Sequence, residues 1–184
     1  YSFYANKHIT TGEGGMIFTN NLKLKDYCAD IRNLCFGKKN RFNHYDIAGN
    51  YRMTNMQAAL GLAQLSRVKK ILSTKKKKGK IYYDYLKKYD DVLYIQKPVY
   101  KKFVNIYWVV GVYIKKKINI KLLRNNLFKS GIQTRDFFYP LNKQDAFKGY
   151  SFYKKKFKNS EDVSKNCFYL PSYLSMKQND IKII

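Results

Sequence analysis

The spacing of apolar residues predicts a short strand and a helix near the start of the chain. The apolar run 16–19 leaves a glycine turn, as a strand does, and Asn20 or Asn21 can cap the helix that follows. Gly37 suits the end of this helix, and the polar residues 38–50 form a long loop. The apolar residues at helical spacing are Leu22, Leu24, Tyr27, Cys28, Ile31, Leu34 and Cys35.

A second helical pattern begins with a capping box formed by Thr54 and Gln57. It weakens at the lysine run 75–78, resumes at Ile81 and ends near Lys88. We therefore expect one long helix, with a polar face or a kink at the lysine run. Its predicted buried side carries Met53, Met56, Leu60, Ala63, Val68 and Ile71.

The second part of the chain alternates between strand-like and helix-like segments. Gly131 closes an amphipathic helix, and Pro140 and Pro171 mark turns on either side of another. This order predicts a small α/β domain over residues 89–184, joined to residues 1–88 by the long helix. The expected elements are strands over 92–95, 103–114 and 132–138, and helices over 120–130, over 161–167 and from near 175.

Length and composition indicate a globular chain. Its 184 residues are 45% hydrophobic, enough for one core or for a small domain plus part of another. The sequence contains no apolar run of membrane-spanning length and no signal-peptide pattern, so we expect a cytoplasmic protein without a membrane partner. Because the chain begins with Tyr1 inside a structured motif, we also expect the protein to extend upstream.

The formal net charge of +25 raises the possibility of nucleic-acid binding. However, 31 of the 37 basic residues are lysines, and they are spread along the whole chain. Phosphate and base recognition favours the rigid donor fork of arginine. A solvated, compositionally biased surface is therefore favoured over a specific nucleic-acid site, and a surface that attracts polyanions is the alternative.

The three cysteines indicate no metal site. Cys28, Cys35 and Cys167 form no Cys-x-x-Cys pair and have no histidine cluster near them. Cys28 and Cys35 are seven residues apart, which would place them on one face of the first helix. We expect all three to be core thiols.

The first fifteen residues contain the strongest candidate for chemistry. Lys7 precedes the glycine-rich stretch Gly12-Glu-Gly-Gly15, and glycines permit positive φ angles and a close backbone approach to a ligand. Taken alone, a lysine near glycines is a weak signal, because most lysines are solvated charges. The surrounding residues strengthen it.

The stretch Ser2-Phe-Tyr-Ala-Asn-Lys7-His-Ile-Thr-Thr-Gly-Glu-Gly-Gly15 resembles the Schiff-base motif of the DegT/DnrJ/StrS family of sugar-nucleotide aminotransferases. Three later segments resemble that family in the same order: 50–65, which begins Asn50-Tyr-Arg-Met-Thr-Asn, then Thr134 to Leu141, and Tyr169 to Ser172. The resemblance covers most of the chain and corresponds to the C-terminal half of a family member. It implies the end of the large domain and the small α/β domain of a fold-type I aminotransferase that depends on pyridoxal phosphate.

The resemblance also implies roles for individual residues. Lys7 would carry the cofactor covalently and transfer protons as general base and acid. The Ser2 hydroxyl would hold the cofactor phosphate, and Asn50 would reach the phosphate in the partner subunit, which implies a homodimer with shared active sites. The family's dehydratases carry histidine in place of this lysine, so Lys7 favours transamination.

Other site residues are less tightly defined. Arg52 could bind an anionic group or be structural, and Arg135 could contact the nucleotide diphosphate or the donor carboxylate. His8 and His44 could line the substrate pocket or simply pack, and Glu13 could stabilise the turn. Where many family members have histidine after Tyr-Pro-Leu, this chain has Asn142, which puts substrate contacts there in doubt.

The implied reaction transfers an amino group from glutamate to a nucleotide-linked 4-keto-6-deoxy sugar, for surface polysaccharide biosynthesis. The residues of the motifs are most similar to those of perosamine synthase-like C4 enzymes. A C3 aminotransferase and a noncatalytic polyanion-binding fragment are the alternatives. The family's cofactor-stacking aromatic residue and its pyridine-binding aspartate lie upstream of the motif. We therefore expect residues 1–184 alone to be poorly folded or inactive.

Overall fold

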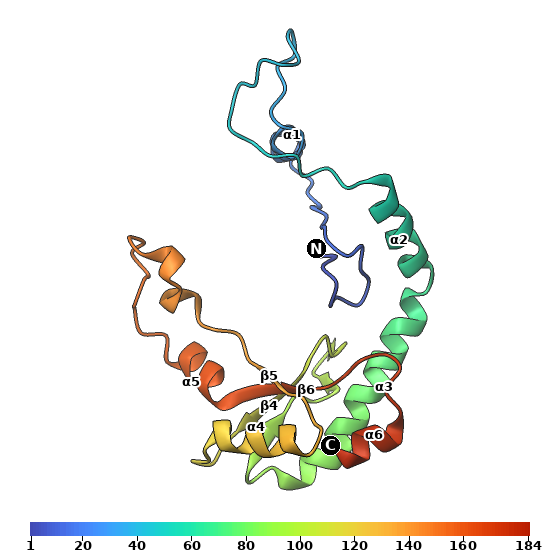
Figure 1. Ribbon diagram of the computed structural model, residues 1–184, viewed down its shortest axis with the longest axis vertical. Helices are drawn as coiled ribbons and strands as arrows, with labels where there is room; N and C mark the ends of the chain where they lie inside the picture. The colour runs from blue at the N-terminus through green and yellow to red at the C-terminus, as the bar shows by residue number, and fades with distance from the viewer. The chain divides into compact units, whose positions relative to one another are not determined.

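A computed structural model describes all of residues 1–184 and divides them into two compact units, Tyr1–Lys69 and Lys70–Ile184 (Figure 1). The division falls near the beginning of the long helix α3, which spans Val68–Leu86. The domain boundary predicted from the sequence, between residues 88 and 89, refers to the domains of the whole protein and stays a prediction.

The first unit contains helix α1, Leu22–Arg32. Asn21 caps it as predicted, because its side-chain oxygen accepts a hydrogen bond from the Leu24 amide at 3.1 Å. The helix ends at Arg32, earlier than predicted, and Leu34 and Cys35 have φ angles of 65° and 46°. The prediction that Cys28 and Cys35 share a helical face is therefore wrong. Cys35 is nevertheless buried.

The predicted strand over residues 16–19 does not form. Met16 pairs with Tyr1 through two backbone hydrogen bonds, and the residues after it have no neighbouring strand. Ile17 and Phe18 are exposed. A strand needs a partner for its amides and carbonyls, and this part of the chain offers none.

The expected long helix is two helices. The capping box of Thr54 and Gln57 begins α2, Asn55–Ser66, and a break at Arg67 separates it from α3. The helical path then ends in a 3₁₀ turn, Lys87–Tyr89. No residue of α2 is buried and Met56 is 83% exposed, whereas Ile71 of α3 is buried, so the predicted buried side is confirmed in α3 and wrong in α2.

A four-stranded antiparallel sheet organises the second unit, in the order β1-β4-β6-β5 (Figure 1). Its strands are β1 Leu93–Ile95, β4 Val110–Ile114, β5 Arg135–Asp136 and β6 Cys167–Leu170. A separate hairpin consists of β2 Val99–Tyr100 and β3 Phe103–Val104, so the predicted strand over 103–114 is two strands. Strand β6, which pairs with both β4 and β5, was not predicted.

Helices α4 Ile120–Lys129, α5 Lys158–Asn166 and α6 Gln178–Ile183 accompany this sheet, with short 3₁₀ turns at Leu141–Lys143 and Asp145–Phe147. Asn119 caps α4, and Gly131 follows it with a φ angle of 80°, as its role at the helix end predicts. Alternate β4 residues face the core. The core contains Tyr82, Ile95, Tyr107, Val110, Val112, Ile114, Phe168, Leu170, Met176 and Ile181.

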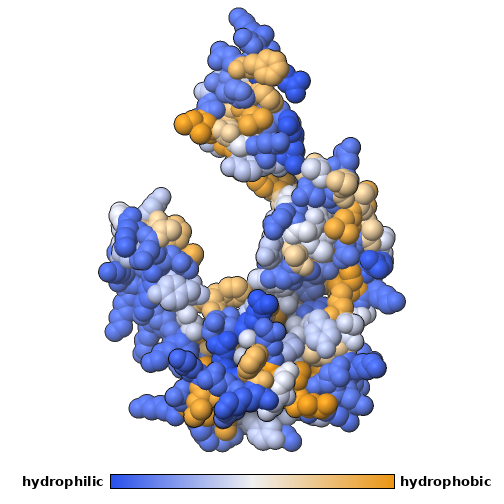
Figure 2. All heavy atoms as spheres, viewed as in Figure 1, coloured by the Kyte–Doolittle hydropathy of each residue, from blue (hydrophilic) through white to orange (hydrophobic).

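Apolar side chains also lie at the surface, and Figure 2 shows them over the segments labelled α1 and α2 in Figure 1. Neither helix buries a residue, although both carry apolar side chains at helical spacing. None of the helices is both long enough and apolar enough to cross a bilayer.

Candidate functional site

Residues 1–16 form a closed loop whose two ends pair with each other. The Tyr1 amino group donates to the Met16 carbonyl, and the Met16 amide donates to the Tyr1 carbonyl at 2.8 Å. Further in, Ser2 pairs with Gly15 and Tyr4 pairs with Gly12. These pairs hold Ser2 at the base of the loop and Lys7 in its distal part.

A turn places Lys7 within this loop. Its amide donates to the Tyr4 carbonyl at 2.9 Å, which closes a β-turn over Tyr4 to Lys7. The Phe3 carbonyl accepts from both the Thr10 hydroxyl and the Thr11 amide at 3.0 Å, so the chain after Lys7 returns beside the chain before it. Lys7 and its neighbour His8 are both half-buried.

Glycines allow this loop to pack against the beginning of α2. Gly14 has a φ angle of 130°, and a Cβ there would lie 2.9 Å from Thr11 Oγ1 and 3.2 Å from Met53 Cε. A Cβ at Gly61 of α2 would lie 2.8 Å from Thr11 Cγ2. Thr11 is buried, so two glycines and one threonine set the position of the loop on the helix.

Asn50 and Arg52 lie on the segment that leads into α2, beside the end of α1. Asn50 pairs with Asn33, whose side-chain oxygen accepts a hydrogen bond from the Arg52 guanidinium. The Asn50 side-chain oxygen is 3.3 Å from the Arg52 amide. Both residues are exposed, so Asn50 is accessible to a partner, while Arg52 has the structural contact that was its alternative role.

Arg135 lies in the other unit, on the edge strand β5, opposite Tyr169 of β6. It is exposed, whereas the neighbouring Asp136 forms an ion pair with Arg124. Arg124 Nε also donates to the Thr134 hydroxyl at 2.9 Å. Arg124 therefore fixes the strand, and the Arg135 guanidinium forms no ion pair.

The remaining polar candidates have local partners. His44 Nδ1 lies 2.6 Å from the Leu34 carbonyl and its ring packs on Phe36, which supports its packing role. Asn142 is buried, and its side-chain amide donates to the Lys155 carbonyl at 2.6 Å. The same amide lies 3.4 Å from Glu161 Oε1 of α5, so its donors are used within the chain, which accords with the doubt about substrate contacts at this position.

The sequence did not predict the burial of two lysines. Lys75 and Lys78 of α3 are buried, although the sequence predicted a solvated lysine run. Lys75 Nζ donates to the Ser172 carbonyl at 2.6 Å and to the Ser172 hydroxyl at 2.9 Å. Burial lowers the pKa of Lys75 to about 8.

Lys78 Nζ donates to three turn carbonyls, those of Tyr173, Leu174 and Met176. Burial lowers its pKa, although the charge of Asp180 opposes this effect. Lys75 and Lys78 are three residues apart, a spacing that places them on one helical face. The sequence did not indicate which lysines of the run 75–78 would be buried. These lysines organise the segment 171–176.

Solved structures of aminotransferases are similar to this chain in shape. Helicobacter pylori PseC, an aminotransferase involved in the biosynthesis of pseudoaminic acid, matches with a TM-score of 0.85 and 24% identity, over 98% of this chain and 49% of its own. A DegT DnrJ EryC1 StrS aminotransferase from Brucella abortus matches with a TM-score of 0.82 and 24% identity, over 99% of this chain and 48% of its own. The chain thus has the fold of one half of such an aminotransferase.

The sequence shows the family itself. The profile of the DegT/DnrJ/EryC1/StrS aminotransferase family matches residues 1–184, and the chain belongs to this family. The GDP-perosamine synthase of Escherichia coli O157:H7 is 34% identical over 181 residues, which is 98% of this chain and 48% of that protein. The GDP-perosamine synthase of Vibrio cholerae is 32% identical over 189 residues. The chain spans about half the length of these relatives.

Proposed function

We propose that the protein containing this chain is a sugar-nucleotide aminotransferase that uses pyridoxal phosphate on Lys7. The observation that carries the proposal is the Ser2 to Gly15 loop. It presents a half-buried lysine on a backbone closed at both ends, in a chain that the family profile matches throughout. The names of the two perosamine synthases support a sugar-nucleotide substrate.

The residues of the loop fit the cofactor's chemistry. An amine can bond an aldehyde, and a hydroxyl can donate to a phosphate, and Lys7 and Ser2 supply these two groups. A Cβ at Gly12, where φ is 81°, would meet no atom within 4 Å, so the loop is open on that side. The loop therefore supplies both reactive groups and leaves the side of Gly12 open.

Pyridoxal phosphate, when bound, supplies an aldehyde and an electron-withdrawing ring. Lys7 Nζ would hold the cofactor at rest and then move a proton to and from the substrate carbon. Ser2 would orient the phosphate from the base of the loop, with the Gly15 backbone paired behind it. His8, Arg52 and Arg135 are the proposed substrate contacts.

Borohydride reduction of the full-length protein, followed by peptide mass analysis, tests the role of Lys7. We expect the reduced cofactor on the Lys7 peptide, and none in Lys7→Ala or Lys7→Arg, because only an unhindered primary amine forms the reducible bond. Lys76→Arg is a matched control on an exposed lysine. Cofactor on another lysine in the Lys7 variants would rule out the assignment.

We further propose glutamate as the amino donor and a nucleotide-linked 4-keto-6-deoxyhexose as the acceptor. Product NMR of the full-length enzyme distinguishes C4 amination from the C3 alternative by the position of the new amine. The polyanion-binding alternative instead predicts salt-dependent affinity for a polyanion and no covalent cofactor. The reduction experiment therefore also separates these two classes of function.

A further inference from the structure

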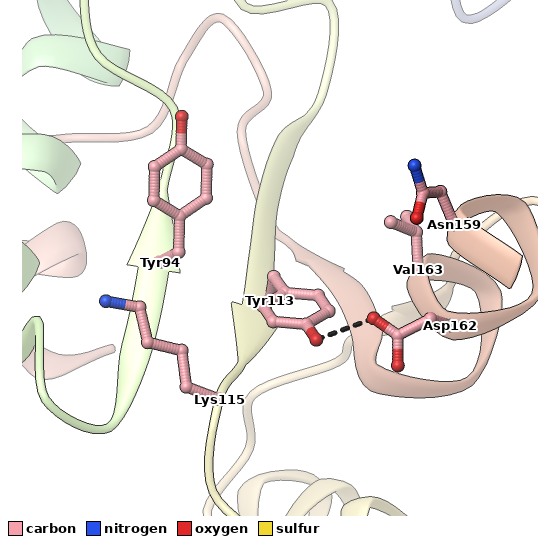
Figure 3. A pocket seen from close by; sticks show the side chains of 6 residues that line it. All are labelled: Tyr94, Tyr113, Lys115, Asn159, Asp162 and Val163. Atoms are coloured by element: carbon pink, nitrogen blue, oxygen red, sulfur yellow. Dashed lines mark hydrogen bonds between the residues drawn. The ribbon is translucent and has the colours of Figure 1, made fainter.

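The second unit has a surface pocket of about 340 Å³ that contains none of the residues assigned to the aminotransferase site (Figure 3). Two neighbouring strands and helix α5 form its walls. In Figure 3, Tyr113 of β4 lies between Tyr94 of β1 and the side chains of α5. The lining residues are Tyr94, Tyr113, Lys115, Asn159, Asp162 and Val163.

The sheet places the two tyrosines side by side. Tyr94 and Tyr113 are direct partners in the β1–β4 register, so their side chains leave the same face of the sheet. Their neighbours Ile95 and Val112 face the core. The alternation along both strands therefore puts two aromatic rings on the face opposite the core, where Tyr94 is 48% exposed.

A hydrogen bond fixes the Tyr113 ring, and other polar groups of the pocket remain able to hydrogen-bond a ligand. The Tyr113 hydroxyl donates to Asp162 Oδ2 at 2.6 Å, which raises the pKa of Tyr113. Asp162 Oδ1 accepts from Asn166 at 2.9 Å. A carboxylate has about four acceptor positions, so Asp162 retains some for a ligand. The Tyr94 hydroxyl and the Asn159 amide make no hydrogen bond within the chain.

The charges in the pocket favour a neutral ligand. Lys115 brings an ammonium group, which donates to the Asp90 carbonyl, and Asp162 brings a carboxylate. A cation would meet Lys115 and an anion would meet Asp162, so neither is favoured. A polyhydroxylated sugar ring suits both features, since its apolar C–H face can pack on tyrosine while its hydroxyls reach the polar groups.

We propose that this pocket binds one sugar ring of a neutral saccharide, with Tyr94 and Tyr113 as the platform and Asp162 and Asn159 as hydroxyl partners. The pocket volume lies at the lower end of the range for small-molecule sites, which suits a single hexose. The open position of the pocket at the edge strand β1 allows the rest of a longer saccharide to extend into solvent.

Saturation-transfer NMR on the full-length protein tests this proposal, with methyl α-mannopyranoside as the neutral probe and choline and glucuronate as charged probes. We expect transfer to the mannoside and about tenfold weaker binding in Tyr94→Ala, because the variant removes one aromatic packing surface. Tyr100→Ala, which alters an exposed tyrosine outside the pocket, is the matched control and should bind as the wild type does.

Asp162→Asn separates neutral from charged recognition. It removes the charge and keeps one acceptor oxygen for Tyr113, while the oxygen that accepts from Asn166 becomes an amide donor, so binding of the mannoside should change by less than about threefold. No transfer to the mannoside, equal binding by Tyr94→Ala and the wild type, or tighter binding of choline or glucuronate would each overturn the proposal.

Discussion

At the scale of single residues, Lys75 and Lys78 are the least expected feature of the molecule. Both are buried cations, and the oxygens that accept their hydrogen bonds are uncharged. Tyr82, one turn further along α3, donates to the Pro171 carbonyl at 2.8 Å. Three donors on one helical face thus satisfy the carbonyls of a segment that has no regular secondary structure to do so.

Replacement of Lys78 should therefore destabilise the second unit. We expect Lys78→Met to lower the free energy of unfolding by about 2 kcal/mol, because it leaves the buried Met176 carbonyl and two half-buried carbonyls without their donor. Denaturant unfolding of the full-length protein measures this change. Lys77→Met, one position earlier on the exposed side, should change it by less than about 0.5 kcal/mol. Equal effects of both variants would contradict the buried role.

Lys75 should make stability depend on pH. Its folded pKa of about 8 lies below the ordinary value of 10.5, so between these values the unfolded chain binds the extra proton. Its contribution to stability therefore rises with pH across about 8 to 9.5, by up to about 1.4 kcal/mol per unit.

Denaturation of the wild type and of Lys75→Met over this range measures the contribution as a difference. The comparison is needed because Cys167, whose burial raises its pKa to about 11, works in the opposite direction above pH 9. Parallel pH profiles for the two proteins would refute the assignment.

At the scale of elements, α3 packs closely against the turn before β4 because α3 has a glycine, which carries no side chain, at the point of contact. Gly79 lies under the ring of Tyr107, and a Cβ there would lie 2.2 Å from the ring. Tyr107 is buried, has a φ angle of 48° and donates to the Gln96 carbonyl at 2.9 Å. The ring therefore has fixed contacts on several sides and little room to move.

Gly79→Ala should consequently destabilise the protein, although alanine favours a helix by about 1 kcal/mol over glycine. We expect a net loss of about 2 kcal/mol from overpacking against Tyr107. Thermal and denaturant unfolding measure it. Lys76→Ala, an exposed change in the same helix, is the control, and a stabilised Gly79→Ala would show that the ring can move aside.

Local signals along the chain predicted the element boundaries that depend on local chemistry. Asn21, the Thr54 capping box and Gly131 act within one turn of their own position, and each was predicted. Strand β6 was not, because its residues directly follow α5 and it owes its conformation to pairing with β4 and β5. Pairing between distant segments leaves no local pattern.

At the scale of the whole molecule, the two units differ in how much they bury. The core lies in the second unit, whereas the only buried residues of the first are Thr11 and Cys35. Hydrogen exchange on residues 1–184 should therefore show strong protection in β4 and β6 and weak protection in α1 and α2. Equal protection in both units would contradict this expectation.

The proposed homodimer with shared active sites makes a separate prediction. If Lys7 of one subunit works with Asn50 of its partner, a mixture of Lys7→Ala and Asn50→Ala subunits restores one intact site per hybrid dimer. Random mixing would then recover up to about a quarter of the wild-type activity, since half of the dimers are hybrids. Mixed subunits that stay inactive would show that both residues act within one subunit.

The sequence by itself determined the family, the lysine motif and the helix caps, because these depend on residue identity and short spacings. The tertiary structure decided the rest: two helices in place of one at Arg67, the inward turn of Lys75 and Lys78, and the position of β6. The physical reason is that burial and strand pairing depend on contacts between distant segments. Lysine is solvated by default and is buried only where the fold brings enough oxygen acceptors to its amine.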